Sequence, residues 1–178
     1  MESQEIASVD ALAEQLRAFL EQSSDVLATA HVFGAGSRAI QAIVASLLTE
    51  RLGFGEEVVL TPQSGFVTMS RPDFFYRLGE GRGILAEVER GGTTTNNHDL
   101  KDFWKANLAP DAHHLFLVVP VANWKEGGEP RERPYALVAR RLGAFFGDPR
   151  REVDVLSAHV FGYGGDELPS ESPSSAAL

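Results

Sequence analysis

Cysteine is absent from this chain of 178 residues. Its absence excludes disulfide bonds, zinc sites with thiolate ligands and a thiol nucleophile, and it leaves open metal sites built from histidine or carboxylate side chains. No apolar run approaches the roughly 20 residues that a membrane-spanning helix needs. The acidic start, MESQEIASVDALAEQ, also lacks the basic and apolar regions of a signal peptide. These absences predict a cytoplasmic protein with no membrane partner.

Positive charge is also scarce. The chain has 16 Lys and Arg residues against 25 Asp and Glu residues, which gives a formal net charge of −9. Such a chain lacks the broad basic field that drives non-specific nucleic-acid binding, and only a local basic groove is compatible with it. A hydrophobic content of 43% suffices for a full core, so we expect one domain over residues 1–163. Residues 164–178 are polar and rich in proline and serine, which predicts a flexible tail.

Hydrophobic spacing divides the domain into helices and strands. Helical spacing covers residues 8–22, 37–52, 96–108 and 135–146, and strand patterns cover residues 56–61, 65–70, 83–90, 113–122 and 151–161. The first two strands, separated by a turn-like Pro-Gln-Ser-Gly segment, are expected to form a hairpin. Because helices connect the later strands, this order predicts an α/β fold in which helices flank both faces of a mixed sheet.

The strand predicted over residues 83–90 ends in two acids. Strand alternation places Glu87 and Glu89 on one face and the apolar Ala86 and Val88 on the other. Neighbouring carboxylates repel each other and are costly to desolvate, so a strand keeps them either around a cation or in water. The pattern therefore indicates either a Mg²⁺ centre or an edge strand whose polar end lies in solvent.

These acids, together with the order of elements, resemble the PD-(D/E)xK nuclease superfamily, which has the restriction-endonuclease-like fold. The core of that superfamily is a helix, three strands, a helix and a strand (αβββαβ), the order predicted over about residues 37–122. Its first acid commonly lies on the leading helix, where Glu50 stands here. Its Pro-Asp pair is matched by Pro72-Asp73, and its next acid by Glu87. A helix before this core and a helix and strand after it would extend the domain.

The resemblance implies a metal-dependent endonuclease, a hydrolase that cuts the phosphodiester bonds of nucleic acid, DNA in preference to RNA. Asp73 and Glu87 would hold Mg²⁺, or Mn²⁺, with Glu50 assisting from the flank. The last motif position, usually lysine, is Glu89 here, as it is in some type II restriction enzymes. Glu89 would orient the attacking water or accept its proton.

A lysine to replace the one missing from the motif could come from the following helix. Lys101 and Lys105 lie one turn apart on a common face of it. Lys101 is therefore added to the candidate catalytic residues. The alternative interpretation is a solvated helix face on which these lysines pair with Asp102.

Two other functions remain open. The missing motif lysine and the acidic charge also fit an inactive nuclease fold that binds nucleic acid or acts as a scaffold. The turn with Gly34 and Gly36, after residues 26–32, has the G-x-G-x-x-A pattern of a phosphate- or nucleotide-binding loop before a helix. The acid expected at the end of the next strand is missing, because Glu56 and Glu57 lie at its start. A homodimer fits the nuclease hypothesis, since a small acidic domain would need a partner to surround a duplex.

Overall fold

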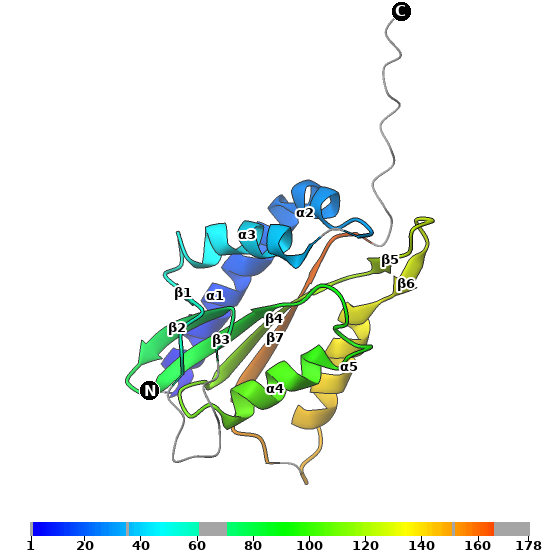
Figure 1. Cartoon of the computed structure of the whole chain (residues 1–178). Coiled ribbons are helices and arrows are strands. Elements are labelled where there is room, and N and C mark those ends of the chain that lie inside the picture. Colours follow the sequence, from blue (N-terminus) through cyan, green and yellow to red (C-terminus); the bar gives the residue numbers. More distant parts are fainter. Residues whose placement is uncertain (1, 35, 61–70, 151, 166–178) are drawn as a thin grey trace, which may run out of the picture.

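A five-stranded mixed sheet forms the middle layer of the protein, with the strand order β1-β2-β3-β4-β7 (Figure 1). The computed structural model describes residues 2–34, 36–60, 71–150 and 152–165. The strands are β1 (Gly55–Glu56), β2 (Phe74–Gly79), β3 (Arg82–Val88), β4 (His114–Pro120) and β7 (Ser157–Tyr163). The pairs β1–β2 and β2–β3 are antiparallel, whereas β3, β4 and β7 run parallel to one another. Parallel pairs need long crossover connections, which the helices supply.

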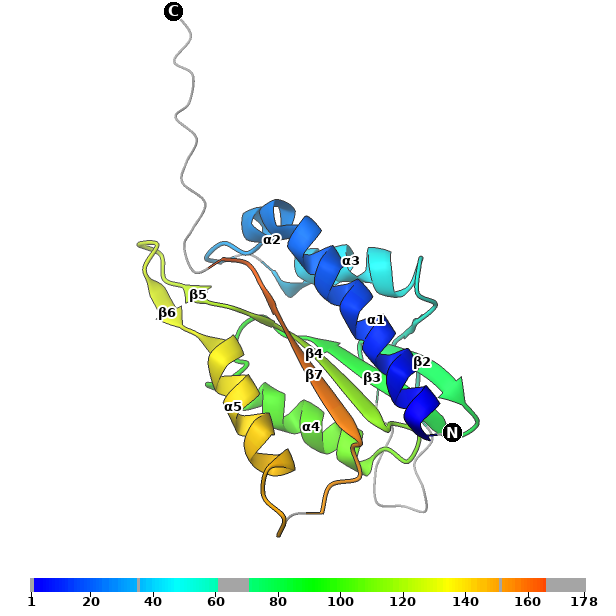
Figure 2. The ribbon, with the colours of Figure 1, turned by 180° about the vertical axis from the view of Figure 1, so that it is seen from behind.

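Helices cover both faces of this sheet (Figure 1, Figure 2). On one face lie α1 (Glu2–Gln22), α2 (Ser24–Ala30) and α3 (Ser37–Leu48), and on the other lie α4 (His98–Leu108) and α5 (Pro134–Phe146). A small hairpin of β5 (Asn123–Trp124) and β6 (Pro130–Glu132) follows β4. None of the helices formed by the described residues is long and apolar enough to cross a lipid bilayer.

Strand alternation in β3 explains why the sheet has a core on each side. Ile84, Ala86 and Val88 pack in the core beneath α1, α2 and α3, whereas Leu85 belongs to the core beneath α4 and α5. Glu87 shares the face of Leu85, so β3 carries an acid that is only 5% exposed toward the α4 side. The neighbouring β4 is buried along its whole length, as expected of a parallel strand covered on both faces.

A polar network fixes the first turns of α1 to the sheet. Glu5 accepts hydrogen bonds from Nε and Nη2 of Arg82 at 2.6 and 2.8 Å, and its Oε1 lies 2.9 Å from Nε2 of His114. The hydrogen bond from Arg82 lowers the pKa of Glu5 to about 2. Because Arg82 begins β3 and His114 begins β4, the network ties α1 to two central strands at once.

The α/β arrangement expected from the sequence, a mixed sheet between helices, is confirmed, but the strands that precede β3 differ in part from the prediction. The strand predicted over 56–61 is reduced to β1, and the one predicted over 65–70 lies outside the described residues. β2, which begins directly after Pro72-Asp73, was not predicted. A tight hairpin is formed by β2 and β3 and turns at Gly81 with φ of 62°, a conformation that glycine adopts without strain.

Three further segments differ from the prediction. Residues 24–30 form α2, which was not predicted, so the glycine turn follows a helix rather than the strand that precedes a nucleotide-binding loop. α3 ends at Leu48, which leaves Glu50 in the turn that follows. The last strand begins at Ser157 rather than at residue 151. The predicted flexible tail falls almost entirely on residues 166–178, outside the described part of the chain.

Candidate active site

Asp73 and Glu87 meet where β2 begins and β3 ends. Antiparallel pairing of Phe74 with Ala86 brings the residues before and after this pair side by side. The amide of Asp73 donates a hydrogen bond to Oε2 of Glu87 at 3.2 Å, and the amide of Val88 donates to Oδ2 of Asp73 at 2.9 Å. The structure therefore brings together two of the three acids that the sequence predicted as metal ligands, Glu50 being the third.

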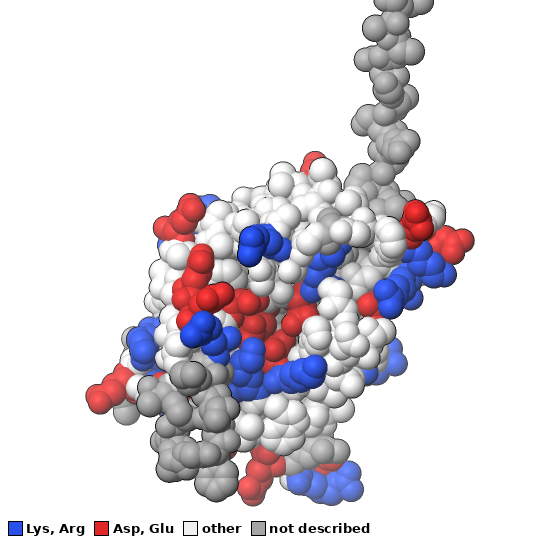
Figure 3. All heavy atoms as spheres, viewed as in Figure 1, with Lys and Arg blue, Asp and Glu red and all other residues white. Residues whose placement is uncertain are grey.

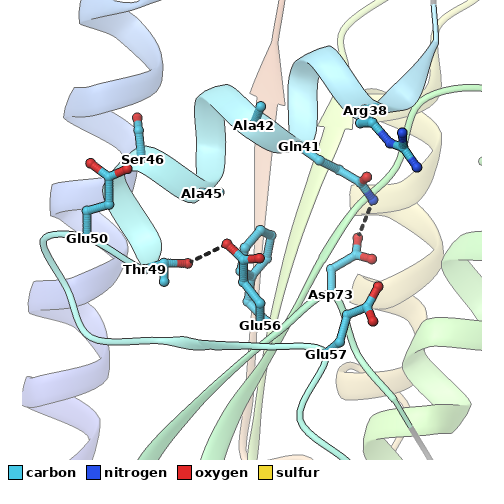
Figure 4. Close-up of a pocket in the computed structure, with 11 residues that line it drawn as sticks. Arg38, Gln41, Ala42, Ala45, Ser46, Thr49, Glu50, Glu56, Glu57 and Asp73 are labelled. Atoms are coloured by element: carbon cyan, nitrogen blue, oxygen red, sulfur yellow. Dashed lines mark hydrogen bonds between the residues drawn. The ribbon is translucent and has the colours of Figure 1, made fainter.

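The leading helix α3 contributes an amide to Asp73 instead of a carboxylate. Nε2 of Gln41 donates to Oδ2 of Asp73 at 3.2 Å (Figure 4). Both residues line a groove of about 460 Å³ between α3 and the chain around β1. Glu50 lines the same groove, but its side chain lies at the opposite end, near Ser46 (Figure 4). The structure thus does not bring Glu50 to Asp73 and Glu87, and Glu57 stands beside Asp73 instead.

The lysine that reaches the acids is Lys105 of α4. Its Nζ donates a hydrogen bond to Oε1 of Glu87 and lies 3.3 Å from Oδ1 of Asp102. Lys101, one turn earlier, is exposed and is not brought to these acids. The predicted pairing with Asp102 is observed for Lys105, but on a buried rather than a solvated face, because Asp102 is only 5% exposed.

Glu89 faces α4 just beyond the end of β3. Its Oε2 lies 3.0 Å from Nδ1 of His98, and its carboxyl hydrogen-bonds with that of Asp102. Oδ2 of Asp102 is buried without a donor when both carboxyls are ionised, and a proton shared with Glu89 is the kind of donor that it lacks. The backbone here is fixed, since the Glu89 amide donates to the Val118 carbonyl and the Tyr163 hydroxyl donates to the Glu89 carbonyl, each at 2.9 Å.

Burial and mutual repulsion make this cluster hold protons. Burial, with the charge of Asp102 adding to it, raises the pKa of Glu87, and burial also raises the pKa of Asp102. Burial raises the pKa of Glu89 to about 7, in spite of the hydrogen bond with Asp102. Burial opposes the charge of Lys105, but the carboxylates of Glu87 and Asp102 together outweigh burial and raise the pKa of Lys105. Figure 3 shows acidic side chains gathered in the hollow between α3 and α4, with basic side chains around them.

The donor atoms suit a hard divalent cation. Within the described part of the chain, no three acidic or histidine side chains are arranged as a ready-made ligand cluster. Mg²⁺ does not require one, because it commonly binds through one or two carboxylates and completes its shell with water and substrate phosphate. Oδ1 of Asp73 accepts no hydrogen bond from the described residues, and Glu87 is a buried carboxyl with a raised pKa. A cation between Asp73 and Glu87 would give Oδ1 of Asp73 a partner and would offset the cost of burying a charge on Glu87.

The sequence contained one signal of the α4 contribution that was not used. His98, Asp102 and Lys105 are spaced i, i+4 and i+7, so they share one helical stripe. That stripe also faces the sheet, since Asp102 is buried and Lys105 is largely so. Charged residues are rarely buried unless they are paired, so a charged stripe on the inner face of a helix indicates partners across the core. Gln41 gave no comparable signal, because a glutamine on a helix is common in any setting.

No family model, curated protein or solved structure matches this chain. The site consists of two adjacent acids, one of which contacts a lysine, and of a third acid, Glu89, whose pKa is raised by burial.

The raised pKa values predict that the metal-free protein loses stability as the pH rises. Between the ordinary pKa of a glutamate and the raised value, the folded state binds more protons than the unfolded state, so the free energy of unfolding falls with increasing pH. Burial lowers the pKa values of three histidines from 6.5. These histidines make the free energy of unfolding rise with pH, but only below about pH 6.5. We therefore expect a lower urea midpoint at about pH 8.5 than at about pH 7 in EDTA.

Glu89→Gln provides the control for this pH dependence. It removes one of the titrating carboxyls and leaves every histidine in place, so the fall in stability between the two pH values should become smaller. The same fall in Glu89→Gln and in the parent protein would show that Glu89 does not titrate in this range.

Proposed function

We propose that this protein is a metal-dependent nuclease of the PD-(D/E)xK superfamily that hydrolyses phosphodiester bonds, with DNA as the favoured substrate. The observation that carries the proposal is the contact of Asp73 with Glu87, with a lysine bound to Glu87. The order α3, β1, β2, β3, α4, β4 supports it, because it is the αβββαβ order of that superfamily. In this proposal Lys105 takes the part of the motif lysine, whose position Glu89 occupies in this chain.

Each residue has a definite task in this chemistry. A divalent ion, when bound, neutralises charge on the phosphate and lowers the pKa of water. Asp73 and Glu87 would hold it, and Gln41 and the Val88 amide fix the orientation of Asp73. Lys105 holds a positive charge against Glu87 and can donate to a phosphate oxygen.

Glu89 is suited to accept the proton from the attacking water. Its pKa of about 7 lies near neutral pH, which is where a general base works best. Asp102 and His98 contact its carboxyl, so the proton can be shared with either. Asp102 and His98 can therefore take up or return a proton as the charge of Glu89 changes during the reaction.

An inactive nuclease fold that binds nucleic acid is the second candidate. The absence of lysine from the motif and the net charge of −9 favour it. A cleavage assay separates the two functions. Supercoiled plasmid and single-stranded DNA are incubated with Mg²⁺, with Mn²⁺ and with EDTA, and nicked or shortened products are followed over time. Products that require the metal support the nuclease. DNA binding without products under every metal condition supports the inactive module.

Mn²⁺ should stabilise the folded protein through Asp73. At a concentration tenfold above its Kd, a ligand of the folded state adds about 1.4 kcal/mol, which corresponds to a rise of roughly 3–6 °C in Tm for a chain of this size. Asp73→Asn should lose most of this rise in a thermal melt. Glu50→Gln is the matched control, since it removes an acid from the far end of the same groove. An equal loss of the Mn²⁺ effect in both variants would place the ion elsewhere.

A further inference from the structure

A second cavity, of about 140 Å³, lies between the glycine turn before α3, the loop after β3 and the β5–β6 hairpin. The residues that line it include Gly34, Arg90, Gly91, Gly92, Trp124 and Arg131. The loop after β3 leaves the candidate active site directly, because Arg90 follows Glu89 in the chain. Three segments that are far apart in sequence therefore form a cavity next to the catalytic acids.

Arg90 brings unused hydrogen-bond donors to this cavity. Its Nη2 donates to the carbonyl of Val32 at 2.7 Å, and among the described residues this is the one acceptor of its guanidinium. Its Nε is buried without a partner. A buried charged donor without an acceptor costs free energy, and the planar guanidinium fork matches the oxygens of a phosphate. Arg90 is thus suited to an anionic ligand.

Arg131 adds a second positive charge from β6. Its side chain is exposed, lines the same cavity and makes no ion pair or hydrogen bond with the described residues. The only acid among the described residues that line the cavity is Glu132. Its two oxygens already accept hydrogen bonds from Thr94 and Asn123, each at 2.8 Å. The cavity therefore contains two arginines and one acid whose acceptors are occupied.

Gly91 keeps one wall of the cavity open. At Gly91 a Cβ atom would meet no other atom within 4 Å, so the backbone there borders open space. Gly92 has φ of 78°, and a Cβ at that position would lie 2.6 Å from Nδ2 of Asn96, so this glycine lets the loop pack against Asn96 rather than opening the cavity. Backbone without side chains lets a phosphate approach amide groups closely. The loop after β3 thus combines a cation with accessible backbone.

We infer that this cavity binds one phosphate of the nucleic-acid strand through Arg90 and Arg131. That phosphate neighbours the phosphate whose ester bond is to be cut. The identity of the ligand rests on the proposed function, but phosphate binding here requires no metal. A phosphodiester substrate needs positive charge where an uncut phosphate lies and carboxylates where the metal binds. The glycine turn that resembles a phosphate loop contributes Gly34 to a wall of the cavity rather than a helix N-terminus.

Arg131→Gln tests the inference, because an exposed side chain can be replaced without unfolding the protein. Short labelled DNA strands are titrated in EDTA, where no cleavage occurs, and fluorescence anisotropy gives Kd over a range of salt concentrations. The Kd should rise about threefold to tenfold, and the slope of log Kd against log salt should become shallower by about 0.7–0.9, the value for one lost phosphate contact. Arg140→Gln removes an exposed arginine from α5 and is the matched control. Equal affinities and slopes in the two variants would overturn the inference.

Two further arms identify the ligand. An abasic strand of the same length should show the same dependence on Arg131, whereas a dependence that vanishes with the bases would reveal base recognition and refute phosphate binding. Inorganic phosphate is titrated separately and followed by ³¹P NMR. Binding of phosphate that depends on Arg131, without DNA binding or cleavage, would keep the phosphate site and reject the nuclease. Metal-dependent cleavage without any effect of Arg131 would keep the nuclease and reject the phosphate site.

Discussion

Glu87→Gln should abolish DNA cleavage while leaving the metal-free protein at least as stable as the parent. Loss of a charged metal ligand removes several kcal/mol of transition-state stabilisation, so we expect a decrease on the order of 10³-fold in the rate, or ~4 kcal/mol. Glutamine fits the same space and keeps an acceptor for the Asp73 amide. It also removes a carboxylate that is costly to bury, because burial raises the pKa of Glu87.

The opposite directions of these two effects make the prediction specific. Rates are measured on plasmid with Mg²⁺, and free energies of unfolding are measured by urea denaturation in EDTA at about pH 8.5, where the charge of Glu87 is most costly. Glu56→Gln is the control, since it removes an equal charge from an exposed position on the opposite face of the sheet, beside α3. Cleavage at the parental rate by Glu87→Gln would exclude Glu87 from the site, whatever happened to stability.

Lys105→Met should also remove activity, whereas Lys101→Met should not. Lys105 contacts Glu87 and Asp102, but Lys101 is exposed one turn earlier on the same helix. Groups that hold or transfer protons in a transition state typically contribute 10²–10⁴-fold to a rate, and we expect a loss of about that size for Lys105→Met. The two variants make the same chemical change on one helix, so they differ only in what the side chain reaches.

The pH dependence of stability and of kcat distinguishes a positioning role of Lys105 from a purely structural one. Without its cation, the cluster of Glu87, Glu89 and Asp102 should bind protons more tightly, so Lys105→Met should be destabilised more at about pH 8.5 than at about pH 6. In the parent, kcat against pH should report a base near 7, the pKa of Glu89. In Lys105→Gln, a milder change, this midpoint should move upward. Equal activities of the Lys101 and Lys105 variants would refute a catalytic lysine on α4.

Local patterns in the sequence predicted the features that depend on local geometry. Alternation along β3 predicted that Glu87 would lie on the face opposite Ala86 and Val88, and the structure has it so. The pattern over residues 113–122 predicted a strand, which the structure has as β4, buried along its whole length. These predictions succeed because side-chain direction in a strand is fixed by the backbone repeat and needs no knowledge of the neighbours. Strand β2, which begins directly after Pro72-Asp73, was not predicted from the sequence.

Only the tertiary structure decided which side chains meet. Whether Lys101 or Lys105 reaches Glu87 depends on how α4 is rotated about its axis when Phe103 and Ala106 pack into the core. Helical spacing alone leaves both lysines as candidates. Likewise, the end of α3 at Leu48 places Glu50 away from Asp73 and leaves Gln41 beside it.

The sequence by itself thus determined the α/β class, the face that Glu87 occupies and the acids worth examining, because these follow from backbone repeats over a few residues. The tertiary structure alone decided the partners of those acids and the cavity around Arg90. Strand register, helix rotation and loop packing are set by contacts between segments far apart in the chain, and these contacts leave no regular spacing in the sequence.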